Sequence, residues 1–249
     1  MTLLTGDSAL LMPWHGPYDM ILADPPYGDT SLAWDRRVLG WPAKARAALK
    51  PTGSLWVFGS LRSFLATGAE FRDAGWKYAQ EVVWEKPNGT SFHADRFRRV
   101  HELIVQFYRD DAPWSGVYND VPTTPDSRPR RVRQRPGQRA PHMGAIGAAS
   151  YVREEGCPRL VRLVIYVPRV LGTAIHPTEK PSALLEILIR TSCPSGGLVG
   201  DWFAGSGAAG VACRLTGRRY VGCEIDPVMA QKARDRIASV LPLGEGIAP

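Results

Sequence analysis

The chain has 249 residues, 44% of them hydrophobic, which is enough to bury a full core in one large domain or one domain with an insertion. Its net charge of +7 favours an anionic partner such as nucleic acid, although plain solubility has the same signature. No apolar run approaches the ~20 residues that span a bilayer, the N-terminus lacks the basic segment of a signal peptide, and no two cysteines form a C-x-x-C pair. We therefore expect a cytoplasmic protein with no membrane segment, disulfide framework or metal site.

The first hundred or so residues alternate strand-like and helix-like stretches. Short apolar runs with β-branched and aromatic residues predict strands at 20–23, 54–58, 80–84 and 103–108. Helical spacing predicts helices at 37–49 and 60–74, which end at Pro51 and Gly53 and at Gly75. This order is typical of a mostly parallel sheet covered by helices.

The segment from about 110 to 169 differs in character, because arginines crowd among prolines in PTTPDSRPRRVRQRPGQRAP. Such a composition does not build a compact core by itself, so we expect a mobile loop or a small insertion. It is either a solvated linker or an arm that binds phosphates through guanidinium groups. The arginines in question are Arg128, Arg130, Arg131, Arg133, Arg135 and Arg139.

The strand–helix rhythm returns after His176. The pattern predicts a helix at 181–191, a strand at 198–202, a glycine-rich loop at 203–207 and a helix at 208–215. A strand at 219–224 and a last helix at 227–240 follow.

The loop sequence FAGSGAAG fits G-x-G-x-x-G through Gly205, Gly207 and Gly210, and Glu224 ends the next strand 19 residues after Gly205. Glycines allow a ligand close to the backbone, and an acid at that distance binds ribose hydroxyls, so this unit indicates an adenosine-containing cofactor. The pattern leaves open NAD or S-adenosylmethionine; Asp201 before the loop suits a sulfonium cation. Few residues follow Glu224, so the unit must complete its sheet with strands from the N-terminal half.

The strand at 20–23 runs into DPPY, residues Asp24, Pro25, Pro26 and Tyr27. An exocyclic amine of a base is a poor nucleophile, because its lone pair is delocalised into the ring. The Asp24 carboxylate and the Pro25 carbonyl are acceptors that would hold such an amine, and the prolines fix the direction of the carbonyl. The Tyr27 ring offers a surface on which an extruded base could stack.

These motifs together resemble the β-class amino-group DNA methyltransferases, and the resemblance covers most of the chain. DPPYGDTSLAWD, with Trp34 and Asp35, is similar to the adenine-N6 branch; HPTEKP resembles motif X and DWFAGSG motif I, in the β-class order. The resemblance implies a Rossmann-like α/β fold with circularly permuted motif order. It also implies methyl transfer from S-adenosyl-L-methionine to adenine N6 in double-stranded DNA by base flipping, within restriction-modification. It further implies a possible homodimer in the cytoplasm of a bacterial or phage-infected cell.

The resemblance also assigns residues and regions. Residues 1–109 would form the catalytic half, 110–170 the target recognition region with the arginines above, and 171–249 the cofactor-binding half. The catalytic residues would be Asp24, Pro25, Pro26 and Tyr27. The cofactor-binding residues would be Asp7, Thr178, Lys180, Asp201, Phe203, Ala204, Gly205, Ser206, Gly207, Glu224 and Ile225.

Three other readings stay open. A cytosine-N4 methyltransferase of the same fold usually carries Ser in place of Asp24, which favours adenine without excluding cytosine. An NAD oxidoreductase explains the glycine loop but leaves DPPY idle. A non-enzymatic nucleic-acid binder explains only the arginines. We expect structural roles for His176 and for His101 with Glu102. The short 110–170 region shows no sequence pattern of a helix-turn-helix or a zinc finger.

Overall fold

The structure is a computed structural model that describes residues 1–29, 31–32, 35–90, 94–124, 130–133, 150–153, 158–168 and 178–241. The chain divides into two compact units, one made of Met1–Asp120 with Leu163–Pro249 and the other of Val121–Arg162. No helix in the described ranges is long and apolar enough to cross a bilayer.

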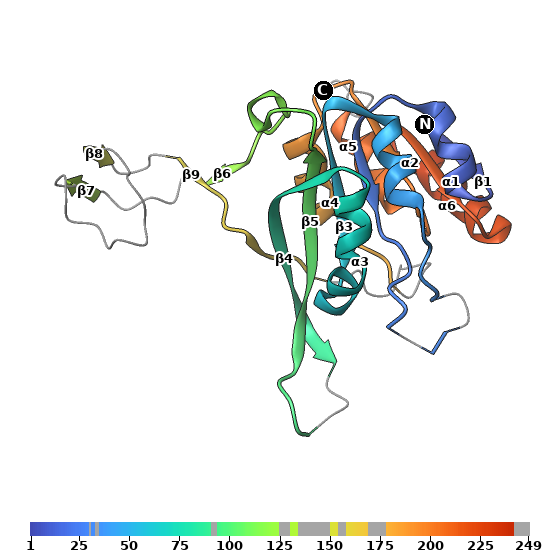
Figure 1. Cartoon of the computed structure of the whole chain (residues 1–249), viewed down its shortest axis with the longest axis horizontal. Coiled ribbons are helices and arrows are strands. Elements are labelled where there is room, and N and C mark those ends of the chain that lie inside the picture. Colours follow the sequence, from blue (N-terminus) through green and yellow to red (C-terminus); the bar gives the residue numbers. More distant parts are fainter. Residues whose placement is uncertain are drawn as a thin grey trace, which may run out of the picture. The chain divides into compact units, whose positions relative to one another are not determined.

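One eight-stranded sheet, in the order β1-β12-β11-β2-β3-β5-β4-β10, forms the frame of the larger unit (Figure 1). Five neighbours, β1, β12, β11, β2 and β3, run parallel; β5 is antiparallel to β3 and β4, and β10 is parallel to β4. This mostly parallel sheet confirms the predicted α/β class. The strands are β1 (Thr2–Thr5), β2 (Tyr18–Ala23), β3 (Leu49–Gly59), β4 (Trp76–Thr90), β5 (Arg99–Arg109), β10 (Val164–Tyr166), β11 (Leu198–Asp201) and β12 (Arg219–Glu224).

Helices cover both faces of the sheet, because successive side chains of a buried strand point to opposite sides. Met20 and Leu22 of β2 belong to a core cluster with side chains of α4, α5 and α6, whereas Ile21 and Ala23 belong to a second cluster with side chains of α2 and α3. The helices are α1 (Ser8–Leu11), α2 (Trp41–Ala48), α3 (Leu61–Asp73), α4 (Ser182–Ser192), α5 (Ala208–Thr216) and α6 (Pro227–Ser239), with the 3-10 turns η1 (Met12–His15) and η2 (Trp114–Gly116).

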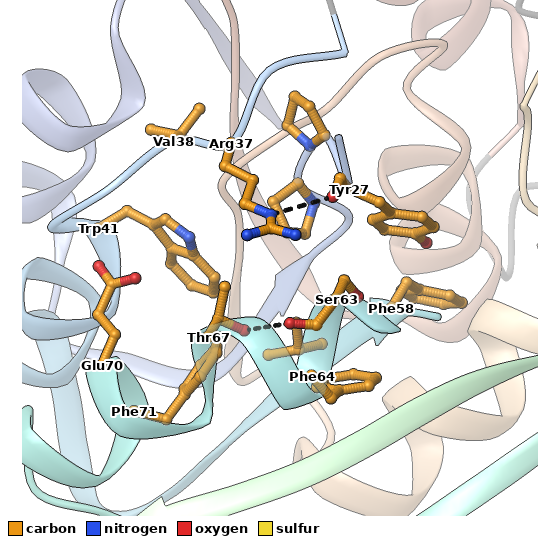
Figure 2. Close-up of a pocket in the computed structure, with 13 residues that line it drawn as sticks. Tyr27, Arg37, Val38, Trp41, Phe58, Ser63, Phe64, Thr67, Glu70 and Phe71 are labelled. Carbon is orange, nitrogen blue, oxygen red and sulfur yellow. Dashed lines mark hydrogen bonds between the residues drawn. The ribbon is translucent and has the colours of Figure 1, made fainter. Parts of the chain in front are cut away.

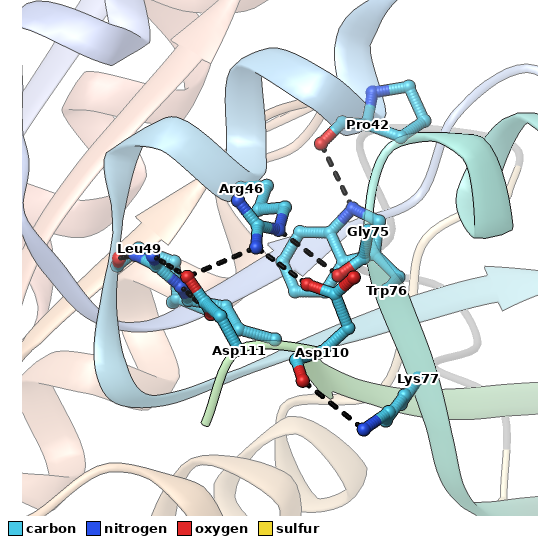
Figure 3. A network of polar contacts seen from close by, with 9 residues as sticks. Pro42, Arg46, Leu49, Gly75, Trp76, Lys77, Asp110 and Asp111 are labelled. Atoms are coloured by element: carbon cyan, nitrogen blue, oxygen red, sulfur yellow. Dashed lines mark hydrogen bonds and ion pairs between the residues drawn. The ribbon is translucent and has the colours of Figure 1, made fainter.

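The two edges of the sheet, at the carboxyl ends and at the amino ends of its parallel strands, carry different groups of residues. The carboxyl ends of the five parallel strands share one edge, the carboxyl edge, where DPPY follows β2 and the glycine loop follows β11. At the opposite, amino edge, Arg46 of α2 contacts Asp110 at 2.6 Å and Asp111 at 3.2 Å (Figure 3). Its Nε also donates to the Gly75 carbonyl, and Trp76 Nε1 donates to Pro42. This amino-edge network joins α2 to the start of β4 and the end of β5.

The smaller unit contains regular structure that the sequence does not predict. Strand β7 (Arg130–Arg133) pairs antiparallel with β8 (Ser150–Arg153), and β6 (Thr123–Thr124) pairs antiparallel with β9 (Arg159–Leu160). The RRVR and SYVR segments contain Val132, Tyr151 and Val152, residue types that favour strands. Of the two expectations, a mobile loop or a small insertion, these paired strands in a separate unit agree with the small insertion.

Other differences lie at element boundaries. Helix α2 begins at Trp41 instead of residue 37, because Gly40 has a left-handed backbone (φ 79°) and Pro42 occupies the first turn. Strand β1 is not predicted from the sequence; it pairs with β12, from the other end of the chain. The predicted strand 219–224 matches β12 in both bounds.

Candidate active site

The acceptor turn DPPY lies at the carboxyl edge, directly after the buried strand β2. Pro25 and Pro26 lack N–H groups, so the turn leaves its carbonyls for other partners. The turn ends at Gly28, whose left-handed backbone (φ 70°) favours glycine and whose N–H donates to Asp35 at 2.8 Å. Asp35, which the resemblance pairs with Trp34, therefore fixes the end of the turn; Trp34 lies outside the described residues.

The Asp24 carboxylate has a partner on each oxygen. The Tyr27 hydroxyl donates to Oδ1 at 2.7 Å, and the Lys180 ammonium lies 2.8 Å from Oδ2. The Asp24 side chain nevertheless keeps a quarter of its surface exposed, whereas that of Lys180 keeps 9%. Lys180 and Tyr27 thus hold the Asp24 carboxylate on its buried side, and its other side is exposed.

Glu102 of β5 is the residue that sequence reasoning did not bring to the site. Its Oε1 accepts from the Tyr27 hydroxyl at 2.5 Å and lies 3.0 Å from the Lys180 ammonium. Its Oε2 pairs with Lys86 of β4 at 2.5 Å. The available signal was an acid directly before the apolar run LIVQF, at the carboxyl edge. We call Asp24, Tyr27, Lys86, Glu102 and Lys180 the carboxyl-edge network.

The charges of this network reinforce one another. Burial opposes the charged form of Glu102, but Lys180 and Lys86 outweigh it and lower the pKa of the carboxyl to about 2. Burial likewise opposes the charged form of Lys180, yet Asp24 and Glu102 raise its pKa above the ordinary value. Burial and the same two carboxylates raise the pKa of Tyr27 well above the ordinary range. Tyr27 is therefore a neutral phenol with one proton between two acceptors.

The network also fixes the Tyr27 ring. The hydroxyl is held by Asp24 and Glu102, and the Lys180 ammonium lies 5.8 Å from the ring centroid and 5.2 Å from that of Phe58. A ring held at its hydroxyl end presents a defined face. The sequence analysis assigns Lys180 to the cofactor, whereas the structure places its ammonium on the acceptor turn.

A small cavity lies behind the turn and is lined by α3, the segment before α2, and the prolines (Figure 2). Arg37 Nε donates to the Tyr27 carbonyl at 3.4 Å across its rim. The cavity backs the turn, with the prolines and side chains of α3 among its walls.

The glycine loop lies at the same edge, between β11 and α5. Gly205 and Gly207 have left-handed backbones (φ 49° and 73°), and a Cβ on Gly205 would meet no atom within 4 Å. The space over Gly205 is open to a ligand, and its backbone conformation requires glycine. A Cβ on Gly210 would overlap Ile237, so that glycine permits α5 to pack on α6.

Glu224, which the spacing predicts to bind a ribose, is hydrogen-bonded to this loop. Its Oε2 accepts from the Gly205 N–H at 2.8 Å, and its Oε1 accepts from the Asp226 N–H at 2.9 Å. Each carboxylate oxygen retains a further lone pair for a hydroxyl donor. A carboxylate next to an open glycine backbone fits the ribose of an adenosyl cofactor.

Asp201 lies beneath the loop. It is buried, and its Oδ2 accepts from the Tyr220 hydroxyl at 3.0 Å. Burial raises the pKa of this carboxyl to about 7, against the hydrogen bonds from Tyr220 and the Phe203 backbone. Its hydrogen bonds with Tyr220 and the Phe203 backbone hold the loop in place from the side of the hydrophobic core.

The remaining predicted residues are distributed around the edge. Asp7 caps α1 through Ala9 N–H at 2.8 Å and follows β1, whose last residue pairs with Glu224. The Phe203 ring packs edge-on against Trp41 at 5.6 Å. Ala204 and Ser206 are buried, and Ile225 and Thr178 are exposed.

The arginine segment is only partly described. Arg130, Arg131 and Arg133 lie on β7, while Arg128, Arg135 and Arg139 lie outside the described residues. His176 also lies outside them. Within the described residues, no group of three or more His, Cys, Asp or Glu side chains is arranged to hold a metal ion.

Fold and site are those of a Rossmann-like α/β protein in which the DPPY turn comes first in the chain and the glycine loop comes last, both on one sheet edge. The model of a family described as DNA methylase, covering amino-group N6 and N4 enzymes, matches residues 18–235. The chain belongs to this family and is an S-adenosylmethionine-dependent DNA methyltransferase. Membership of this family does not favour the alternative of an NAD-binding oxidoreductase.

Named relatives cover most of the chain. It is 26% identical over 245 residues to the type II methyltransferase M2.DpnII of Streptococcus pneumoniae, covering 88% of this chain and 82% of that protein. It is 24% identical over 252 residues to the type II methyltransferase M2.MboI of Moraxella bovis, covering 90% and 82%. These relatives support the predicted link to restriction-modification.

Solved structures share the fold. The M1.HpyAVI–SAM complex superimposes with a TM-score of 0.62 at 22% identity, covering 94% of this chain and 98% of that one. The cytosine-N4-specific PvuII DNA methyltransferase superimposes with a TM-score of 0.66 at 16% identity, covering 99% and 87%. The fold is thus shared by enzymes of differing sequence.

Proposed function

We propose that this methyltransferase acts on the N6 amine of adenine at a specific sequence in double-stranded DNA. The observation that carries the proposal is the Asp24 carboxylate, which ends β2 in an Asp-Pro-Pro-Tyr turn with Lys180 on one oxygen and Tyr27 on the other. A negatively charged acceptor with a fixed direction suits an amine that must be drawn out of conjugation.

The acceptors would act together on the amine. Asp24 Oδ1 would accept one amine hydrogen, and the Pro25 carbonyl would accept the other. When the amine takes its place at Oδ1, the Tyr27 hydroxyl keeps its bond to Glu102, which lies at 2.5 Å. The network therefore exchanges one donor for another without losing a hydrogen bond.

S-adenosylmethionine supplies an electrophilic methyl group on a sulfonium. The residues that would hold it are Glu224, at the ribose, and the open Gly205 backbone. The amine loses one proton as it is methylated. The Asp24 carboxylate, which the turn would hold beside the amine, would accept that proton. The Tyr27 ring would stack on the extruded base.

The smaller unit, Val121–Arg162, would contact the target sequence, with the arginines of β7 as phosphate ligands. A homodimer and a cytoplasmic location are further parts of the proposal, and light scattering of the purified chain would measure the former.

The base is tested by product analysis. The purified chain is incubated with labelled S-adenosylmethionine and DNA, and the DNA is digested to nucleosides. We expect N6-methyladenine, and methylation-aware sequencing gives the surrounding sequence. N4-methylcytosine as the product would overturn the adenine assignment and leave the family membership intact.

The cofactor site is tested separately by calorimetry. Glu224→Ala should weaken S-adenosylmethionine binding by about 1.5–3 kcal/mol per lost charged hydrogen bond. Lys50→Asn, at the amino edge, is the control. Unchanged affinity of Glu224→Ala would contradict the ribose assignment.

A further inference from the structure

The β4–β5 ribbon extends beyond the carboxyl edge of the sheet. Strand β3 stops pairing with β5 at Gly59, opposite Leu103. The β4–β5 ladder continues past that point, through Trp84 opposite Glu102 to Thr90 opposite Arg99 (Figure 1). The ribbon therefore projects from the same edge that carries the acceptor turn.

The returning arm of this ribbon carries an exposed aromatic ring among arginines. Phe97 is fully exposed, at 101% of its reference surface. Arg96, Arg98 and Arg99 beside it are also exposed. Arg96 pairs with Asp95 at 3.0 Å, whereas the ion pairs found among the described residues include none for Arg98 or Arg99. An exposed aromatic ring flanked by guanidinium groups is the combination with which proteins bind nucleic acid, through stacking on bases and contacts to phosphates.

The root of the ribbon is part of the active site. Glu102 of β5 bonds the Tyr27 hydroxyl, and Lys86 of β4 pairs with Glu102. Phe97 comes five residues before Glu102, and five residues of extended chain span roughly 16–17 Å. The major groove of DNA is only about 8.5 Å deep. The arm is therefore long enough to reach the base stack from a site that receives an extruded base.

We propose that this arm enters duplex DNA beside the target base, with Phe97 as an apolar wedge in the stack and Arg98 and Arg99 on the flanking phosphates. The proposal rests on the proposed function, because a site that methylates an amine inside a duplex needs the base extruded. An apolar wedge replaces part of the stacking that the duplex loses. The arginines supply the electrostatic contact that holds the wedge in register.

The test compares two substrates that differ only at the partner of the target base. One duplex has the target normally paired, and the other has it opposite an abasic site, where extrusion costs little. Phe97→Ala should slow methyl transfer to the paired target roughly 10- to 100-fold, from the energy of stacking a base on an aromatic ring. The loss should largely disappear on the abasic duplex. Trp14→Ala is the matched control, because Trp14 is 86% exposed and lies in η1, at the amino end of β2.

The arginines are tested by the salt dependence of duplex binding, which requires no methyl transfer. Arg98→Gln with Arg99→Gln should flatten the log–log salt slope by up to ~0.9 per lost phosphate contact. The wedge would be overturned if Phe97→Ala slowed methyl transfer equally on the two duplexes. It would also be overturned if the Phe97→Ala rate were no lower than the Trp14→Ala rate. An unchanged salt slope would overturn the phosphate contacts. An inactive wild-type chain would refute the proposed function instead, and the salt slope would still decide whether the arm contacts DNA.

Discussion

The two edges of the sheet each carry a polar network, and the two networks differ in what surrounds them. At the amino edge, Arg46 contacts Asp110 and Asp111, whose side chains are about half exposed. At the carboxyl edge, Lys180 and Glu102 are about nine-tenths buried, and Asp24 keeps a quarter of its side-chain surface. The first network joins segments of the fold in water, where charges are screened. The second holds charges in a protein environment and directs one carboxylate outward.

Burial explains why similar ion pairs have different consequences. Exposed pairs contribute little to stability, because water solvates the separated charges nearly as well. In a buried network the removal of one charge leaves its partners uncompensated. The comparison therefore predicts strong effects at the carboxyl edge and weak effects at the amino edge.

The largest effect on stability should follow from Lys180→Met, which keeps an unbranched side chain one atom shorter but removes the cation between two carboxylates. Breaking a buried pair in this way costs about 3–5 kcal/mol, to be measured by urea unfolding at pH 7. The double variant Lys180→Met with Glu102→Gln should recover part of the loss. A loss below about 1 kcal/mol for the single variant would mean that the site behaves like an exposed pair.

Acid titration sharpens the same comparison. The pKa of Glu102 falls from its ordinary 4.5 to about 2 in the folded protein, so its contribution is present above pH 4.5 and is lost as the pH falls through that interval. The difference corresponds to at most about 3 kcal/mol. Glu102→Gln should therefore lose less stability than the wild type between pH 4.5 and 2.

Asp111 provides the control for this titration. Its pKa is also lowered to about 2, first by the hydrogen bond from Arg109, but the group is exposed. Asp111→Asn should change the acid dependence less than Glu102→Gln does. Equal acid dependence in the Glu102→Gln variant and the wild type would contradict the proposed charge state of the network.

The smallest effect should follow from Arg46→Met at the amino edge. We expect a loss of about 1 kcal/mol or less in urea unfolding, because the pairs with Asp110 and Asp111 are largely solvated. The single-turnover rate of methyl transfer should stay at the wild-type value. A clear fall in that rate would show that the amino edge influences the chemistry and that the two networks are coupled.

Local patterns predicted the two halves of the fold well. The bounds of β12 follow from an apolar run between an arginine and an acid, and Ser60 caps α3 through its bond to the Ser63 N–H. The DPPY turn and the glycine loop were found because each has its chemistry within a few consecutive residues. The spacing of one strand–helix–strand unit indicated that Glu224 would lie near the glycine loop as a ribose ligand, and in the structure it accepts from the Gly205 N–H.

Contacts between distant segments were not accessible in the same way. Glu102 meets Tyr27 across 75 positions, and β1 pairs with a strand from the other end of the chain. No local pattern encodes such a pairing. Lys180 was assigned to the cofactor from its place before a helix, and its contact with Asp24 depends on how α4 packs on β2. The strands β7 and β8 were missed because the arginines and prolines of the surrounding segment dominate its composition.

The most direct test of the central claim, that Asp24 activates the target amine, is the single-turnover rate of Asp24→Asn with saturating DNA and S-adenosylmethionine. The amide keeps the shape of the side chain but removes the charge and presents a donor to an amine that is itself a donor. We expect the rate to fall roughly 10²–10³-fold, by analogy with the loss of one preorganised polar group in an active site. Cofactor affinity should be retained, because the proposed cofactor site lies at Glu224 and the glycine loop, away from Asp24 in the sequence. A near-normal rate would contradict the account, as would a variant whose loss is explained entirely by failure to bind S-adenosylmethionine.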